Sequence, residues 1–188
     1  MFLLRCRTVF SFLLLIYSSA YAYTETLNIS ATIEAPTCEL NVVGESGGII
    51  NLGEVDIIDF ESEQILTRKG KTLVLKLSNC KGAGWGGLKP TLKISGVQEG
   101  VSGNGIFRSS SRSTSQNIGV LLKYDATDYS QSKELEGNPF YWELSQDSDR
   151  VPDEQLYSFW LGLTRVADYA LIRAGTVGAE FKFSFEWH

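Results

Sequence analysis

Apolar and polar residues alternate over most of the chain, and clusters of glycine, serine, asparagine and proline interrupt the alternation. A period of two places every second side chain on one face of a β-strand, whereas a helix repeats every 3.6 residues. The pattern predicts strands over residues 71–80, 91–96, 117–125 and 156–164, and a short, weakly periodic helix over residues 59–68. Short strands separated by turns predict one all-β domain, a sandwich or a barrel.

Both ends of the chain alternate with particular regularity. In residues 23–35 every even position is polar, and only Glu25 breaks the apolar face of odd positions. In residues 177–188 the apolar set is Val177, Ala179, Phe181, Phe183, Phe185 and Trp187. A slip by one residue would expose all of these side chains, so the register of such strands is fixed. Chain termini are usually polar and frayed, so a regular alternating arm leads us to expect that residues 23–35 pair with a partner as a β-strand. The alternative is that they form an ordinary edge strand of a closed domain.

The first 22 residues have the features of a secretory signal peptide. Arg5 and Arg7 supply a positive start, residues 9–17 are apolar, and Ala20-Tyr21-Ala22 forms a small-x-small cleavage site. The apolar run is shorter than the roughly 20 residues that a membrane-spanning helix needs. We therefore expect export with cleavage after Ala22, in preference to an uncleaved anchor, and no membrane insertion.

Charge and cysteine content narrow the function further. The chain has 17 Lys and Arg against 22 Asp and Glu, and loss of the leader removes two of the basic residues, leaving a formal charge of about −7. This charge argues against nucleic acid as a partner. Cleavage also removes Cys6, so Cys38 and Cys80 remain in an exported protein and can form only one internal disulfide.

Two other sequence motifs give only weak indications of catalysis. Residues 44–48 match the G-x-S-x-G pattern around Ser46, but this pattern needs a strand–turn–helix elbow and a base, and His188 is the only histidine. Glu134 and Glu136 could form a glycosidase pair, but two charges in a polar turn are more often solvated. We expect no enzymatic activity, no metal and no cofactor.

Four features in this order resemble the pilin subunits of chaperone–usher fimbriae. They are the alternating arm before Cys38, the segment Ile50-Asn51-Leu52-Gly53, the strand that ends in Asn79-Cys80, and a closing strand with Gly175 fourteenth from the end and an aromatic residue, Trp187, in penultimate position. The chain departs from the family pattern at Ala31, where glycine is frequent, and at Trp187, where tyrosine is usual.

The resemblance implies an incomplete immunoglobulin-like β-sandwich that lacks its final strand. It divides the chain into a signal peptide (1–22), a donor-strand arm (23–35) and a pilin domain (36–188). Leu27, Ile29, Ala31 and Ile33 would be the donor residues that complete a neighbouring subunit, a mode of strand addition known from pilins. The acceptor groove and the chaperone contact would be formed by Gly175, Val177, Ala179, Phe181, Phe183, Phe185, Trp187 and His188.

The partners implied by the resemblance are a periplasmic pilus chaperone, an outer-membrane usher and neighbouring pilin subunits, and the final location is a fimbrium on the cell surface. A composition rich in aromatic residues favours a minor, tip or adaptor subunit that supports adhesion. The alternative is a glycan-binding module at the fibre tip, with Trp85 and Trp142 as the residues that would stack on sugar rings.

Overall fold

The computed structural model describes residues 37–44, 48–82, 84–98, 105–146, 154–167 and 171–188. The chain divides into two units, Met1–Ile33 and Glu34–His188, and all described residues belong to the second. The signal peptide, the arm of residues 23–35 and Ser46 lie outside the described residues, so their predicted roles stay predictions.

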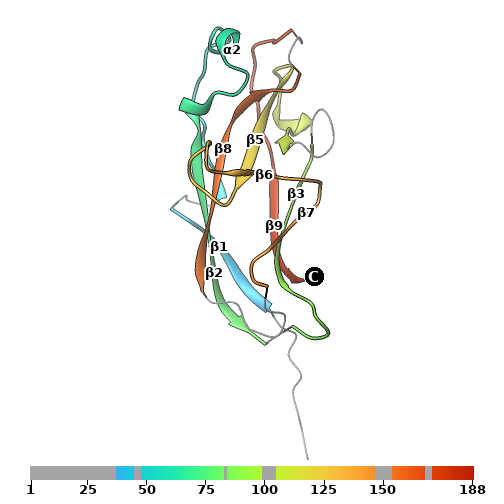
Figure 1. Ribbon diagram of the computed structural model, residues 1–188. Helices are drawn as coiled ribbons and strands as arrows, with labels where there is room; N and C mark the ends of the chain where they lie inside the picture. Colours follow the sequence, from blue (N-terminus) through green and yellow to red (C-terminus); the bar gives the residue numbers. More distant parts are fainter. Residues whose placement is uncertain (1–36, 45–47, 83, 99–104, 147–153, 168–170) are drawn as a thin grey trace, which may run out of the picture. The chain divides into compact units, whose positions relative to one another are not determined.

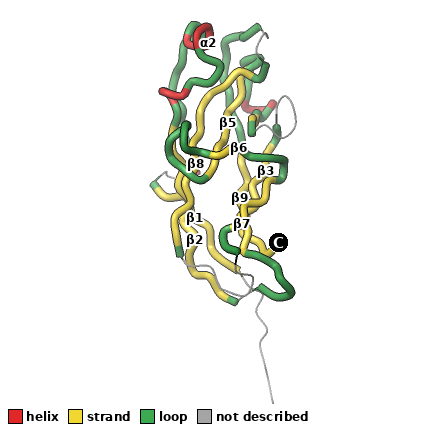
Figure 2. Tube along the Cα trace, viewed as in Figure 1, coloured by secondary structure: helices red, strands yellow, loops and turns green. Residues whose placement is uncertain are grey.

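The described residues form two antiparallel sheets (Figures 1 and 2). The larger sheet has the order β1 (Thr37–Val43), β2 (Lys71–Lys81), β8 (Gln155–Arg165), β5 (Ile118–Tyr124) and β4 (Ile106–Phe107), with β6 (Lys133–Glu134) also paired to β5. The smaller sheet has the order β7 (Phe140–Glu143), β3 (Pro90–Gly96) and β9 (Phe181–Trp187).

Side chains from both sheets form one hydrophobic core, which confirms the predicted all-β sandwich. The larger sheet contributes the alternating positions of β2, β5 and β8, and the smaller sheet contributes Leu92 and Ile94 of β3. Phe181, Phe183 and Phe185 of β9 are half-buried against the same core. The alternation seen in the sequence therefore marks the faces that pack together.

The predicted strands are present with small changes at their ends. The segments expected over residues 71–80, 91–96, 117–125 and 156–164 correspond to β2, β3, β5 and β8. The closing strand is shorter than predicted, because β9 begins only at Phe181.

The helix predicted over residues 59–68 is wrong beyond its first turn. The structure has a single turn, α2 (Asp59–Ser62), and a separate 3-10 turn, η3 (Thr67–Lys69). Between them the backbone N–H of Leu66 donates to the Leu163 carbonyl at 2.9 Å, and Ile65 forms a bridge with Thr164. Pairing with β8 thus competes successfully with a helix whose sequence pattern is weak.

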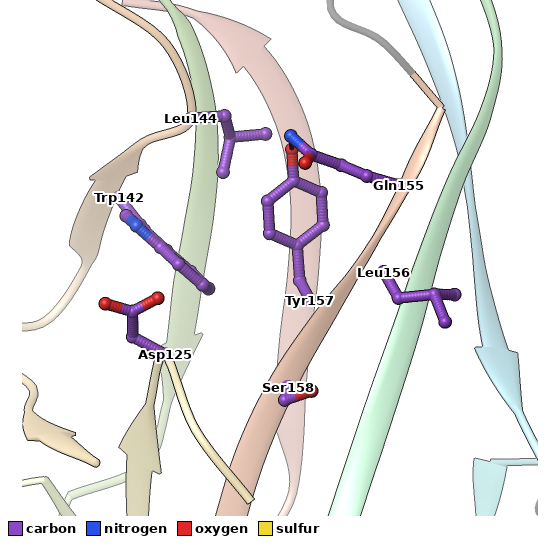
Figure 3. A pocket seen from close by; sticks show the side chains of 7 residues that line it. All are labelled: Asp125, Trp142, Leu144, Gln155, Leu156, Tyr157 and Ser158. Atoms are coloured by element: carbon purple, nitrogen blue, oxygen red, sulfur yellow. Dashed lines mark hydrogen bonds between the residues drawn. The ribbon is translucent and has the colours of Figure 1, made fainter. Parts of the chain in front are cut away.

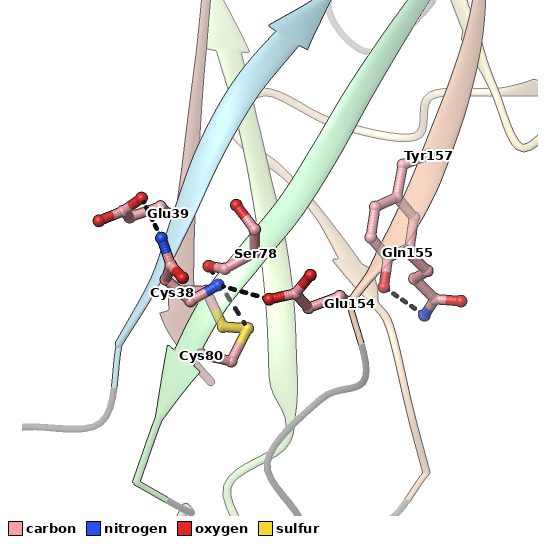
Figure 4. Close-up of a disulfide and its surroundings, with 8 residues drawn as sticks. Cys38, Glu39, Ser78, Cys80, Glu154, Gln155 and Tyr157 are labelled. Atoms are coloured by element: carbon pink, nitrogen blue, oxygen red, sulfur yellow. Dashed lines mark hydrogen bonds between the residues drawn. A yellow bond between two sulfur atoms is a disulfide. The ribbon is translucent and has the colours of Figure 1, made fainter.

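The predicted Cys38–Cys80 disulfide is present and joins the edge strand β1 to β2 (Figure 4). The Cα atoms are 4.1 Å apart, and the pairing of β1 with β2 is irregular at this point. Beside the bond, the Asn79 side chain donates to Glu39 at 2.8 Å, and the Asn79 backbone N–H donates to Glu154 at 3.1 Å. The bond thus anchors β1 near the point where the arm of residues 23–35 leads into the domain.

Candidate functional site

A groove of about 1090 Å³ follows the segment that leads into β9. One wall is formed by residues 48–55, and the other by residues 174–181 together with Phe183. The floor consists of Leu73 from β2, Val120 from β5, and Leu161 and Leu163 from β8. All four floor residues belong to the main hydrophobic core. The groove therefore opens onto the interior of the sandwich, between the two sheets.

Apolar side chains along both walls are only partly covered. Ile50, Leu52 and Val55 on one wall, and Val177 and Ala179 on the other, are half-buried and pack against the core. Complete burial of a Val, Leu or Ile side chain is worth about 1.5–3 kcal/mol. A chain segment that filled the groove would gain up to this free energy for each apolar side chain that it inserts, and the uncovered part of it for each half-buried wall residue.

The C-terminal wall is held by the loop that follows the 3-10 turn η4 (Ser110–Arg112). The backbone N–H groups of Thr114 and Ser115 both donate to the Thr176 carbonyl at 2.9 Å. Two residues on, the Gly178 N–H donates to the Ser113 hydroxyl at 3.1 Å. The backbone groups of even-numbered wall residues thus bond to the loop.

Gly175 is required by this close approach. Its φ is +153°, and a Cβ at this position would lie 2.6 Å from the Ser115 backbone nitrogen and 2.7 Å from the Thr114 hydroxyl. Such distances are below van der Waals contact, so any other residue would push the wall away from the loop. The glycine noted in the sequence therefore has a physical role in placing the wall.

Among the described residues, β9 pairs with β3 along one edge and forms no strand pairing along its other edge. His188 and Lys89 exchange both backbone hydrogen bonds, at 2.9 and 3.0 Å. Antiparallel ladders alternate between bonded and non-bonded pairs, so the backbone groups of even-numbered residues point to β3. The N–H and C=O groups of Phe181, Phe183 and Phe185 then point to the open edge.

The open edge thus combines two kinds of unpartnered surface. The same odd-numbered residues direct apolar side chains to the core and backbone groups outward to the edge. Unpaired edges of this kind are templates for the addition of a strand.

Charged groups contribute little to the groove. Arg112 and Glu180 lie at its border with 4.0 Å between Arg112 Nε and a Glu180 carboxylate oxygen, and both side chains are exposed. Exposed pairs of this kind are worth at most about 1 kcal/mol. The site is therefore suited to an apolar, extended chain segment.

The structure brings five of the predicted groove residues together, namely Gly175, Val177, Ala179, Phe181 and Phe183. Phe185 and Trp187 continue the same strand face beyond the groove, with their ring centroids 5.9 Å apart. His188 lies outside the groove and stacks on the Tyr141 ring at 4.1 Å. The predicted chaperone contact of these three residues stays a prediction.

The opposite wall, residues 48–55, was not predicted as part of the site. Ile50-Asn51-Leu52-Gly53 supported the family resemblance, but nothing in its sequence shows that it faces residues 174–183. The alternation of Ile50 with Asn51 and Leu52 was the only available indication. Locally, the Gly53 N–H donates to the Asn51 side chain at 2.8 Å, and Gly53 has a φ of +81°.

A second, smaller cavity of about 320 Å³ contains Trp142, one of the proposed sugar-stacking residues (Figure 3). Trp142 packs edge-to-face on Tyr124, Tyr157 and Phe159 with centroid distances of 4.9–5.8 Å. Asp125, which also lines the cavity, is paired with Lys133 at 2.6 Å. Trp142 is thus half-buried and packs against the core with three aromatic neighbours, which weakens the interpretation as a sugar platform.

Other candidate chemistry finds no support in the part of the chain that the structure describes. Glu134 and Glu136 are exposed. Among the described residues there is no group of three metal-ligating side chains. Within the same residues, none of the helices has both the length and the hydropathy needed to span a membrane.

No protein-family model and no curated protein matches the sequence. Solved structures do match. The P pilus rod subunit PapA is similar over 87% of this chain and 100% of its own, with a TM-score of 0.54 and 13% identity. A chain of a chaperone–usher pilus whose structure addresses rod uncoiling matches over 88% of this chain and 96% of its own, with a TM-score of 0.53 and 14% identity.

These similarities show that the chain has the fold of chaperone–usher pilus subunits. The resemblance inferred from the order of the sequence motifs is confirmed at the level of the fold. At such low identity, function follows from the site and not from the fold alone.

Proposed function

We propose that this protein is a structural subunit of a bacterial surface fibre that is assembled by donor-strand exchange. The groove beside β9 accepts the arm of a neighbouring subunit, and residues 23–35 fill the groove of the next one. The single observation that supports this most is the groove itself, which opens onto the core along an edge with no strand partner among the described residues. The fold similarity to pilus subunits is independent support.

The arm and the groove are complementary in their pattern. An inserted strand with the alternation of residues 23–35 would place Leu27, Ile29 and Ile33 over the floor and its polar residues in water. Burial of these three side chains would contribute about 5–9 kcal/mol before the cost of ordering the arm. Backbone hydrogen bonds to the open edge of β9 would add to this gain.

The proposed function also requires that the groove be covered during export. A subunit with an open apolar groove must be covered while it crosses the periplasm, because exposed edges and core surface lead to aggregation. We assign this role to a periplasmic chaperone that binds β9 and His188, followed by transfer at an outer-membrane usher. The aromatic content of 12% favours a minor, tip or adaptor position that supports adhesion, and a role without catalysis.

The test exploits the alternation in the arm. Ile29→Asn places a polar amide on the apolar face, whereas Thr32→Asn makes a comparable change on the polar face. Loss of one buried Ile costs about 1.5–3 kcal/mol, which corresponds to a roughly 10- to 100-fold loss in affinity. We expect Ile29→Asn to reduce the formation of subunit pairs from chaperone-bound protein, and Thr32→Asn to leave it nearly unchanged, as measured by size-exclusion chromatography with light scattering.

A deletion of residues 23–35 separates the two roles of the subunit. The truncated chain should still bind chaperone and accept an arm, but it should donate none. If the truncated chain alone formed multimers as long as those of the full chain, the donor-strand role would be wrong.

A further inference from the structure

Residues 176–180 lead into β9 and repeat the hydrogen-bond pattern of a strand, although they belong to none of the strands. The Thr176 N–H donates to the Thr114 hydroxyl at 2.9 Å, and the Thr176 carbonyl accepts from the Thr114 N–H at 2.9 Å. Two residues on, the Gly178 carbonyl accepts from the Ser109 N–H at 2.8 Å. A repeat of two residues on one side of the backbone is the pattern of an extended chain.

A loop replaces β3 as the partner of this segment. β3 ends at Gly96, which pairs with Phe181 at the start of β9. A Cβ on Gly96 would lie 2.6 Å from the Glu180 carbonyl oxygen, so this oxygen is also on the side of β3. Before Glu180, the even-numbered residues bond to the loop of residues 109–115. One side of the chain is thus paired without interruption, first by the loop and then by β3.

The odd-numbered residues of the segment keep their backbone groups unpaired. Because the even-numbered residues face the loop and β3, the N–H and C=O groups of Val177 and Ala179 point to the opposite side, as those of Phe181 and Phe183 do. Neither Val177 nor Ala179 has a backbone partner among the described residues. The open edge of β9 therefore extends back to Val177, and from there to Phe185 it is about 26 Å long at roughly 3.3 Å per residue.

This extension borders more of the groove than β9 does. On the C-terminal side the groove is lined by residues 174–181 and by Phe183, and only Phe181 and Phe183 of this set belong to β9. Val177 and Ala179 are half-buried and pack against the core. A chain segment in the groove thus meets the unpaired backbone of the extension together with its apolar side chains.

The Ser113 hydroxyl lies at the centre of the contact between the loop and the extension. It accepts from the Gly178 N–H at 3.1 Å and donates to the Gly178 carbonyl at 3.2 Å, and one hydroxyl can do both. Ser113 therefore bonds Gly178 as a residue of a neighbouring strand would. The close approach depends on glycine, since a Cβ on Gly178 would lie 2.9 Å from the Arg112 Cβ.

On the basis of the proposed function, we infer that Ser113 is a positioning residue for the segment that the groove accepts. Its hydroxyl holds Gly178 against the loop, and this keeps the backbone groups of Val177 and Ala179 turned to the groove. The accepted segment is an extended, alternately apolar arm of another pilus subunit. It pairs with residues 177–185 and not with β9 alone, so it needs about nine consecutive extended residues.

Binding of a synthetic peptide tests this role. The probe is a peptide of about eleven residues in which threonine alternates with leucine, long enough to cover the extension and β9. Fluorescence anisotropy gives its affinity for the full chain, and amide hydrogen exchange shows where it pairs. We expect the bound probe to protect the amides of Val177, Ala179 and Phe183. Ser113→Ala should bind the probe about tenfold more weakly and lose protection at Val177 and Ala179, but not at Phe183.

Three further variants test whether the hydroxyl is responsible. Ser113→Thr keeps a hydroxyl and should restore affinity and protection. Ser110→Ala removes an exposed hydroxyl of η4 that has no partner among the described residues, and it should change neither quantity. Thr114→Val removes the acceptor of the Thr176 N–H and should show the same selective loss at Val177, and it replaces Ser113→Ala if that variant does not fold.

The outcomes separate the role of Ser113 from the proposed function. Probe binding by Ser113→Ala within about twofold of the wild type, or an equal loss of protection at Phe183, would show that Ser113 does not position the extension, and the proposed function would stand. A folded Ser113→Thr variant that failed to restore binding would lead to the same conclusion. If the wild-type chain bound no probe and gained no protection at residues 177–185, the groove would accept no strand, and both the proposed function and the role of Ser113 would be wrong.

Discussion

The substitution Gly175→Ala tests whether the C-terminal wall of the groove depends on close approach of the backbone. A Cβ at this position would lie 2.6 Å from the Ser115 nitrogen and 2.8 Å from the Thr114 carbonyl carbon, both of which are backbone atoms. Relief of the contact would move the wall away from the loop and weaken the two hydrogen bonds to the Thr176 carbonyl.

The expected decrease in the free energy of unfolding has two parts. A φ of +153° at an alanine costs about 1–3 kcal/mol, and overpacking against backbone costs about 1–3 kcal/mol more. The total of about 2–6 kcal/mol is a large share of the free energy of unfolding of a typical domain, which is roughly 5–15 kcal/mol. Gly44→Ala is the matched control, because Gly44 has a φ of +91° but no atom lies within 4 Å of the place that a Cβ would take. It should cost only about 1–2 kcal/mol.

Urea denaturation with the disulfide intact, followed by tryptophan fluorescence, measures both variants. Amide hydrogen exchange at Thr114 and Ser115 reports locally, and we expect faster exchange there in Gly175→Ala. If Gly175→Ala lost no more stability than Gly44→Ala and exchange at the two amides were unchanged, the explanation of Gly175 by crowding would be refuted.

Two further predictions concern parts of the domain away from the groove. Replacement of Cys38 and Cys80 by serine opens a loop with a sequence separation of 42 and should lower the free energy of unfolding by about 4 kcal/mol, measured in urea; a loss below about 1 kcal/mol would contradict the loop-entropy argument. The Ser130 hydroxyl and backbone N–H donate to Asp128 and hold the pKa of its carboxyl below the ordinary 3.8. The associated stabilisation is present above pH 3.8 and is lost as the pH falls through the lowered pKa. Ser130→Ala should raise this pKa toward 3.8 in an NMR titration, and an unchanged midpoint would exclude the hydroxyl as its main cause.

The groove helps to explain why the closing strand alternates so regularly. A closing strand that borders a groove needs apolar side chains on its inner face even though only one of its edges is paired. Phe181 and Phe183 meet this need by packing on Phe107 and Phe159 of the larger sheet, with centroid distances of 4.9 and 5.3 Å. The strand is thereby held in place while its other edge stays available.

From the sequence alone, β2, β3, β5 and β8, the apolar face of β9 and the disulfide could be predicted, whereas β1, β4, β6 and β7 were not predicted as strands. Alternation identifies a strand face such as Leu73 and Leu75 because the side-chain period of a strand is local. Cys38 and Cys80 could be paired because the third cysteine, Cys6, lies in the predicted leader. The open edge of β9 was also foreseeable, from the apolar alternation of residues 177–188 and the family resemblance.

Only the tertiary structure decided which distant segments meet. The wall of residues 48–55, the position of Trp142 among core aromatic side chains, and the end of the helix pattern at Ile65 depend on contacts with residues far away in the chain. Gly175 shows the same limit, because the atoms that exclude a side chain there belong to Thr114 and Ser115. Local patterns report which face of a segment is buried, whereas its neighbours are chosen by packing of the whole domain.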